Sequence, residues 1–195
     1  MNERFPAASH SMKAKGIKGG NTMSLAVKSY DRRSAAAYAQ RWAYFRNPDF
    51  LDFSDLGGDC TNFASQCIYA GSGVMNFTPT YGWYYLTSSN RTASWTGVHY
   101  LYQFLTSNQG VGPYATETGL LQMRPGDIIQ LALDEDRFQH SPVVVEIRGL
   151  IPTPGTIYVA AHSYDADCRP LSSYPYRDIR CLHIEGVRYN SGGSR

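Results

Sequence analysis

The chain has 195 residues, of which 43% are hydrophobic, 17% charged and 13% aromatic. This length and composition are typical of one globular domain whose core needs neither disulfides nor a structural metal. No apolar run approaches the roughly 18 to 20 residues that a membrane span requires, so we expect no membrane span.

The formal net charge of +2 is unevenly distributed. Residues 1–33 hold seven Lys or Arg and two acidic residues, whereas the remainder holds 11 basic against 14 acidic residues, a net charge of −3. A nucleic-acid-binding protein would carry its basic stripe on the folded part of the chain. We therefore expect no nucleic-acid partner.

The basic excess lies in residues 1–29, which are rich in Gly, Ser, Ala and Lys. This segment lacks the apolar core of a secretory signal. We expect a flexible leader, an expression remnant or the stub of a longer precursor, followed by one domain over residues 30–195. The location would be the cell wall or extracellular space if an export signal precedes this sequence, and the cytoplasm otherwise.

The first predicted helix covers residues 30–46, which are rich in strong helix formers. Asp31 is suited to cap its N-terminus, and Pro48 lies just beyond its end. Four residues recur at helical spacing and predict one buried face: Ala35, Tyr38, Trp42 and Phe45.

Two further helices follow. Residues 60–70 place Phe63 and Cys67 on one face, and Gly71 is the predicted stop. A third helix is predicted over residues 96–107.

The character of the chain then changes to strands. Hydrophobic alternation and turn residues predict four strands, with a turn at residues 134–137: 127–133, 140–147, 156–162 and 179–189. Helices followed by antiparallel strands predict an α+β fold.

Cys60 is the residue with the strongest chemical signal. It follows the flexible pair Gly57-Gly58 at the start of the second helix, where backbone N–H groups and the helix dipole would lower a thiol pKa. Cys67 lies on the apolar face and is expected to fill the core. Asp59 would oppose ionisation if its carboxylate lay close, and we expect it to cap the helix instead.

A thiol nucleophile works best with an imidazole that serves as base and acid. Of the five histidines, His140 opens the second predicted strand and His162 ends the third. If these strands are antiparallel neighbours, the start of one lies beside the end of the other. The two imidazoles are then expected to meet near Cys60.

Four segments in this order resemble the bacterial putative amidase domain family, which is related to the NlpC-like and CHAP peptidases. They are GGDCTNFASQC at 57–67, PGDIIQL at 125–131, FQHSPVVV at 138–145 and AAHSYD at 160–165. The resemblance extends over about residues 30–189.

The resemblance implies a papain-like α+β fold in which a nucleophile helix packs on an antiparallel sheet. It implies Cys60 as nucleophile, His140 as base and His162 as the polar third member, with Asp165 as a rival for that place. Pro142 is compatible with this arrangement if it stands at the first residues of its strand or on an edge. No cofactor or metal is implied.

Acyl transfer through a thioester follows from these roles. Backbone N–H groups at the helix start would receive the oxyanion, and the second donor would be Asn62 or a residue of the 48–58 loop. The leading substrate class is a peptidoglycan peptide or glycopeptide. The oligomeric state stays open.

Nine aromatic residues lie between positions 77 and 104, and five of them fall in the segment 72–94, which has no clear periodicity. Such a cluster suits stacking on a sugar or peptide, and we predict Trp83 and Tyr84, with Asp59 and Asn62, as substrate-binding residues. The alternative is a small satellite core beneath a long loop.

Other interpretations remain open. The fold could be a catalytically inactive module that binds peptide or cell-wall glycopeptide. Cys181 and His183 share a strand face and could ligate zinc with Cys168. Cys168 and Cys181 could instead form a disulfide, which would indicate an oxidising compartment.

Overall fold

The computed structural model describes residues 24–134 and 137–191. Residues 1–23 of the predicted leader and residues 135 and 136 of the predicted turn lie outside this range. Within it, no helix combines the length and apolarity that crossing a membrane would require.

The helices lie close to their predicted positions. They are α1 (Arg32–Trp42), α2 (Cys60–Ser72), α3 (Ala93–Thr96) and α4 (Val98–Ser107), with short 3₁₀ helices η1 (Ser54–Leu56), η2 (Leu120–Gln122) and η3 (Leu171–Ser173). Asp31 caps α1 as expected, because its side chain accepts a hydrogen bond from Ser34 N at 3.0 Å. The helix ends at Trp42, four residues earlier than predicted, and Phe45 beyond it is exposed rather than buried.

Gly71 does not end α2, which continues to Ser72 and terminates at Gly73 in the left-handed conformation. A Cβ atom at Gly71 would lie 2.4 Å from a ring carbon of Tyr30. The glycine therefore permits α2 to approach the segment that leads into α1, and Gly73 supplies the stop.

The described strands form one seven-stranded sheet and a small hairpin. They are β1 (Leu25–Lys28), β2 (Tyr85–Thr87), β3 (Asn90–Arg91), β4 (Gly112–Thr118), β5 (Ile128–Ala132), β6 (Val143–Ile147), β7 (Ile157–Ala161), β8 (Ala166–Pro170) and β9 (Asp178–Asn190). The large sheet has the order β1-β9-β5-β6-β7-β8, and β4 also pairs with β9. All pairings are antiparallel, which confirms the predicted α+β class with an antiparallel sheet.

One strand comes from the segment that we expected to be a leader. Leu25–Lys28 forms β1 and pairs with residues 187–190 of β9. Part of residues 1–29 therefore belongs to the sheet.

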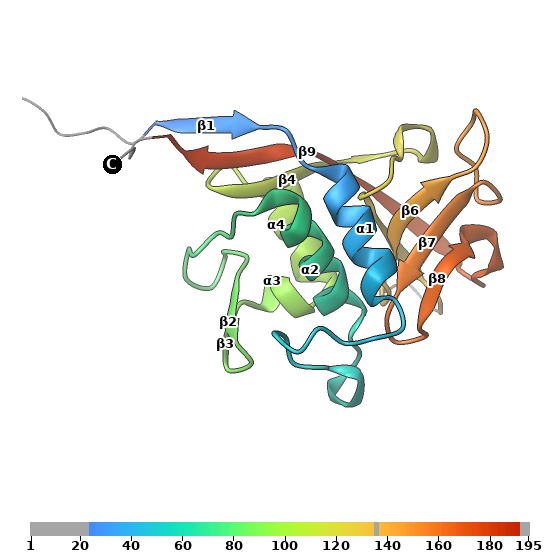
Figure 1. Ribbon diagram of the computed structural model, residues 1–195, viewed down its shortest axis with the longest axis horizontal. Coiled ribbons are helices and arrows are strands. Elements are labelled where there is room, and N and C mark those ends of the chain that lie inside the picture. The colour runs from blue at the N-terminus through green and yellow to red at the C-terminus, as the bar shows by residue number, and fades with distance from the viewer. Residues whose placement is uncertain (1–23, 135–136, 192–195) are drawn as a thin grey trace, which may run out of the picture.

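The sheet is packed on both faces. The helices cover one face, and Figure 1 shows α1 next to β6, β7 and β8. Helix α1 packs against α2, and α3 contacts both α2 and α4. Alternate residues divide between the two cores: Val143 and Val145 face the helices, whereas Val144 packs with Met123 and Leu171 on the other side.

This topology brings the predicted site residues to one end of the sheet. Val143 of β6 pairs with Ala160 of β7, so the start of β6 lies beside the end of β7. Pro142 directly precedes β6, and its carbonyl accepts a hydrogen bond from Ile129 N at 2.9 Å. The proline therefore stands where a missing N–H is tolerated.

Candidate active site

Cys60 is the first residue of α2, and the chain reaches it through a glycine turn. Gly57 and Gly58 have φ angles of 106° and 110°, in the left-handed region where a side chain is strained. A Cβ atom at Gly58 would also lie 3.2 Å from Ser163 Oγ. The turn therefore lets the start of α2 approach the segment that follows β7.

A cavity of about 730 Å³ opens in front of Cys60. His140 lines the same cavity, so the predicted nucleophile and base share one space although they come from distant parts of the chain. Charged groups also line it: Arg46, Asp134 and Asp165. The cavity is therefore polar, with charges of both signs.

The Cys60 thiol is buried in the cavity wall. Its Sγ donates to the Gln139 carbonyl oxygen at 3.7 Å and lies 3.8 Å from Thr61 Oγ1. Burial raises the pKa of this thiol, and the charge of Asp59 adds to the increase. Hydrogen bonds oppose the increase without cancelling it. The resting group is therefore the thiol, which corrects the expectation that the helix start would hold a thiolate.

His140 is only 2% exposed, and its ring packs against that of Tyr174, with centroids 5.6 Å apart. Burial, followed by the charge of Arg169, lowers the pKa of His140 to about 4. The imidazole is therefore neutral at neutral pH and able to accept a proton. No hydrogen bond joins it to Cys60 Sγ in the described part of the chain, as is common before a substrate tightens a catalytic site.

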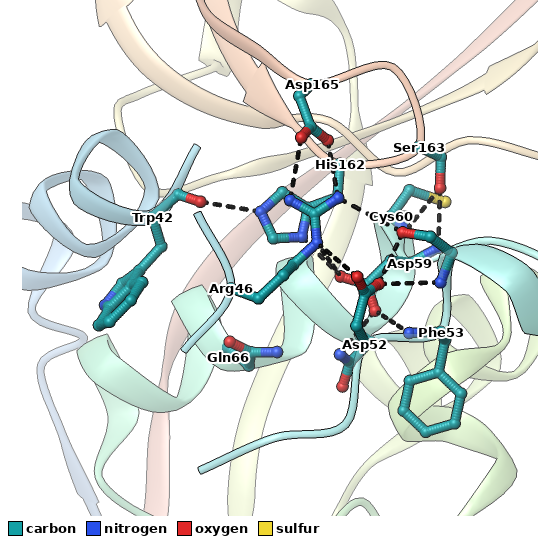
Figure 2. Close-up of polar contacts among 12 residues, drawn as sticks. Trp42, Arg46, Asp52, Phe53, Asp59, Cys60, Gln66, His162, Ser163 and Asp165 are labelled. Atoms are coloured by element: carbon teal, nitrogen blue, oxygen red, sulfur yellow. Dashed lines mark hydrogen bonds and ion pairs between the residues drawn. The ribbon is translucent and has the colours of Figure 1, made fainter. Parts of the chain in front are cut away.

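His162 does not meet His140. Its Nε2 donates to the Trp42 carbonyl oxygen at 2.9 Å, and its Nδ1 lies 2.5 Å from Asp59 Oδ2 (Figure 2). The ring also stacks on Phe63 of α2, with ring centroids 3.9 Å apart. Both nitrogens are thus engaged on the helix side of the sheet. This placement corrects the expectation that His162 orients His140.

Asp59 and Asn62 are buried and fully engaged. Asp59 Oδ1 accepts hydrogen bonds from Phe53 N at 2.9 Å and Asn62 Nδ2 at 2.8 Å. Asn62 also donates to the Leu51 carbonyl at 3.0 Å and accepts from Trp95 Nε1 at 2.9 Å. Asp59 therefore joins the loop before α2 to the helix instead of capping an N–H group of α2. These contacts leave neither side chain facing a substrate, contrary to our expectation.

Ser163 caps α2 from another part of the chain. Its Oγ accepts hydrogen bonds from Asp59 N at 2.7 Å and Cys60 N at 3.2 Å (Figure 2). The N–H of Cys60, expected to receive an oxyanion, is therefore already engaged. Sequence analysis missed this residue because a cap supplied from a distant segment has no local spacing, although Ser163 directly follows the predicted His162.

Arg46, also missed from the sequence, organises the acidic side chains at the cavity. Its guanidinium donates to both Asp165 oxygens at 3.0 and 2.9 Å and lies 3.3 Å from Asp52 and 3.8 Å from Asp59. Asp165 lines the cavity but is held by this bidentate pair. The structure thus brings Asp165 near the site without bringing it to His140.

The aromatic segment builds a core. Trp83 is 0% exposed, donates to Ser65 Oγ at 3.0 Å and stacks on Phe104 with centroids 5.9 Å apart. Tyr84 packs against Phe77, with centroids 5.4 Å apart. Neither lines the cavity at Cys60. This placement corrects the prediction that Trp83 and Tyr84 bind substrate. Trp83 belongs to the main core on the helix side of the sheet, not to a separate satellite core.

Cys168, Cys181 and His183 form neither the zinc site nor the disulfide that the sequence analysis considered. His183 Nδ1 pairs with Asp127 Oδ2 at 2.8 Å, and its Nε2 lies 3.3 Å from Arg32 Nη2. Across residues 24–134 and 137–191, no three His, Cys, Asp or Glu side chains come together as a metal site requires. Cys168 and Cys181 are separate thiols, without the disulfide we considered.

Sequence comparison relates the chain to known proteins. The chain is 35% identical over 164 residues to the "Uncharacterized protein YhbB" of Bacillus subtilis (strain 168), a match that covers 82% of this chain. It spans only 49% of that relative. No solved structure matches the chain significantly. The model of the family described as "Putative amidase domain" matches residues 29–184, so the chain belongs to this family, whose description indicates hydrolysis of amide bonds.

Proposed function

We propose that the protein is a cysteine amidase that hydrolyses an amide bond through a thioester acyl-enzyme. The observation that carries this proposal is that Cys60 and His140 line one cavity although they come from separate elements. The nucleophile stands on the first residue of a helix, where it is fixed by backbone geometry rather than by a flexible loop.

The protonation states support a general-base mechanism. A thiol and a neutral imidazole form the resting pair, because burial raises the pKa of Cys60 and lowers that of His140. As Sγ bonds to the substrate carbonyl carbon, the thiol proton passes to His140. The imidazolium then gives this proton to the leaving amine as the C–N bond breaks.

In deacylation His140 again acts first as a base and then as an acid, now towards water and the sulfur. Water attacks the thioester carbonyl while His140 accepts one of its protons, the C–S bond breaks, and the proton returns to the sulfur. The products are a carboxylic acid and the regenerated thiol. The step needs no group beyond the two side chains and water.

We further assign the domain to a papain-like architecture related to the NlpC-like and CHAP peptidases. Support comes from the order of the four motif segments and from α2 packed on an antiparallel sheet, with His140 shortly before β6 at a bridge to Leu131. In this assignment α2 is the nucleophile helix.

The proposed substrate is a peptidoglycan peptide. Such peptides carry both amines and carboxylates, and the cavity presents Arg46, Asp134 and Asp165. A volume of about 730 Å³ falls within the usual range for a small-molecule site and would accommodate a short peptide segment.

Digestion of purified muropeptides, with mass detection of the fragments, tests the proposal. The wild-type protein should release a fragment that gains one water across an amide bond, and Cys60→Ala should abolish this product. Cys168→Ala is the matched control, because Cys168 is a partly exposed thiol that does not line the cavity. Full hydrolysis by Cys60→Ala would refute the cysteine mechanism. Equal binding of intact muropeptides by both proteins, without cleavage, would indicate the binding-module alternative.

A further inference from the structure

His140 and Tyr174 each carry a buried polar atom without a hydrogen-bond partner among the described residues, and Tyr174 packs in the core on the side of the sheet away from the helices. His140 Nε2 and the Tyr174 hydroxyl are both buried, and neither has a hydrogen-bond partner in the part of the chain that the structure describes. The two rings lie against each other, with centroids 5.6 Å apart and planes inclined by 41°. Each side chain is more than nine-tenths buried, at 2% and 6% exposure.

Such atoms are uncommon in folded proteins. The great majority of buried polar side-chain atoms are hydrogen-bonded to protein or ordered water, and an isolated exception calls for an explanation. Here two exceptions occur on side chains in contact. A tyrosine hydroxyl both donates and accepts, so it is complementary to either state of an imidazole nitrogen. A direct bond or one bridging water would satisfy both atoms at once.

Tyr174 is well placed to act as a fixed partner. It directly follows η3, and its backbone N–H donates to the Leu171 carbonyl. The Arg169 guanidinium lies 3.9 Å from the centre of its ring and donates to Ser173 Oγ at 2.8 Å. Burial raises the pKa of Tyr174, so its hydroxyl keeps its proton at neutral pH.

We propose that Tyr174 is the positioning residue for His140. Its hydroxyl accepts the Nε2–H of the imidazole, directly or through one buried water, and so holds the tautomer whose Nδ1 lone pair is available to Cys60. This inference rests on the proposed function of Cys60 and His140. Because Nε2 is the buried nitrogen and His140 lines the cavity, Nδ1 is the nitrogen left to face the thiol. His162 and Asp165 are engaged by other partners and leave this role open.

The tautomer of His140 can be measured without any substrate. We would label the histidines with ¹⁵N and record two-bond ¹H–¹⁵N spectra at neutral pH, with His140→Gln to assign the signal. The wild-type protein should show His140 as the Nε2–H tautomer. Tyr174→Phe removes only the hydroxyl and should shift His140 toward a mixture of tautomers. Tyr176→Phe is the matched control, because Tyr176 packs against the same core; it should leave the His140 signals unchanged.

Two spectral results would overturn the inference. One is a wild-type His140 that is mainly the Nδ1–H tautomer, a result that requires no variant to fold. The other is a folded Tyr174→Phe protein whose His140 signals match those of the wild type.

Kinetics provide the second readout. On the amide substrate that the wild type cleaves, Tyr174→Phe should lower kcat about 10- to 100-fold with little change in KM, by analogy with the groups that orient metal-ligating histidines. An unchanged kcat would refute the role of Tyr174 while leaving the proposed function intact. Activity that persists in Cys60→Ala would refute the proposed function itself, whatever the state of His140.

Discussion

The protein holds two equally buried histidines in opposite hydrogen-bonding environments. His162 is 1% exposed, and both its nitrogens are engaged, by Asp59 and by the Trp42 carbonyl. His140 is 2% exposed, yet its Nε2 has no partner among the described residues. Burial alone therefore does not separate a structural histidine from a reactive one. The difference lies in access to the cavity: His140 lines it, and we infer that its Nδ1 exchanges the proton there.

The same contrast extends to the surroundings of each ring. His162 belongs to a network that joins α1, the loop before α2 and the end of β7 through Asp59. His140 lies beside the cavity, between Cys60 in front and Tyr174 behind. We infer that the first region maintains the geometry of the α2 N-terminus and that the second carries the proton transfer.

The largest expected effect is on catalysis at His140. His140→Gln should lower kcat about 10³-fold, because general acid–base catalysis by one side chain contributes roughly 10²- to 10⁴-fold. Hydrolysis of the cleaved amide substrate, measured on folded protein, gives this value. His99→Gln is the control, since His99 is exposed on α4 and should retain full activity. A His140→Gln protein with wild-type kcat would reverse the assignment of the two histidines.

The stability of the region around His162 should depend on Asp59. Asp59→Asn removes the buried carboxylate that meets His162 and Arg46, and the loss of one partner from a buried, charged hydrogen-bond network costs about 3 kcal/mol in unfolding free energy. Urea denaturation of the two proteins measures the loss. Asp52→Asn is the control, because this more exposed carboxylate meets the same Arg46 and should cost less than about 1 kcal/mol. Equal losses for the two variants would contradict the structural role of the buried pair.

The pH dependence of the unfolding free energy is a third way to distinguish the region around His140 from the region around His162. The pKa of His140 is about 4 in the folded protein against an ordinary value of 6.5. Between these values the unfolded chain binds a proton that the folded protein does not, so stability from this group is complete above pH 6.5 and falls as the pH decreases toward 4. The loss should reach about 3 kcal/mol, at roughly 1.4 kcal/mol for each pH unit.

The measurement is the difference in unfolding free energy between wild type and His140→Gln across this pH range. All other titratable groups are common to both proteins, so their contributions cancel in the difference. A difference that stays constant from pH 6.5 to 4 would show that the His140 pKa is not depressed.

The sequence predicted the interior of this fold better than its edges. The central strands β5, β6 and β7 and the long β9 were predicted because their apolar residues are buried on both faces or alternate clearly. Three other strands of the large sheet, β1, β4 and β8, have no clear local pattern, and each pairs with a single neighbour. Edge strands have one solvated side, and they carry polar residues and proline, as in β4 (GPYATET) and β8 (ADCRP).

The site residues also fall into two groups, those that the sequence predicted and those that it did not. Cys60 and His140 stand in motifs whose local pattern indicates chemistry, and the structure brings them to one cavity. The contributions of Ser163, Arg46 and Tyr174 depend on contacts between segments distant in sequence, for which local spacing gives no signal. The pairing of His162 with Asp59 was missed for the same reason.

The smallest effect concerns Ser163, which joins the two regions by capping α2 from the end of β7. Ser163→Ala should cost about 1 kcal/mol in unfolding free energy, because the N–H groups of Asp59 and Cys60 lose their acceptor. Ser163 also has a φ of 73°, so Ser163→Gly loses the same cap but relieves about 1 kcal/mol of backbone strain. The glycine variant should therefore be nearly as stable as the wild type in urea denaturation. If alanine and glycine destabilise equally, the strain is absent, and if neither destabilises, the cap does not hold the start of α2.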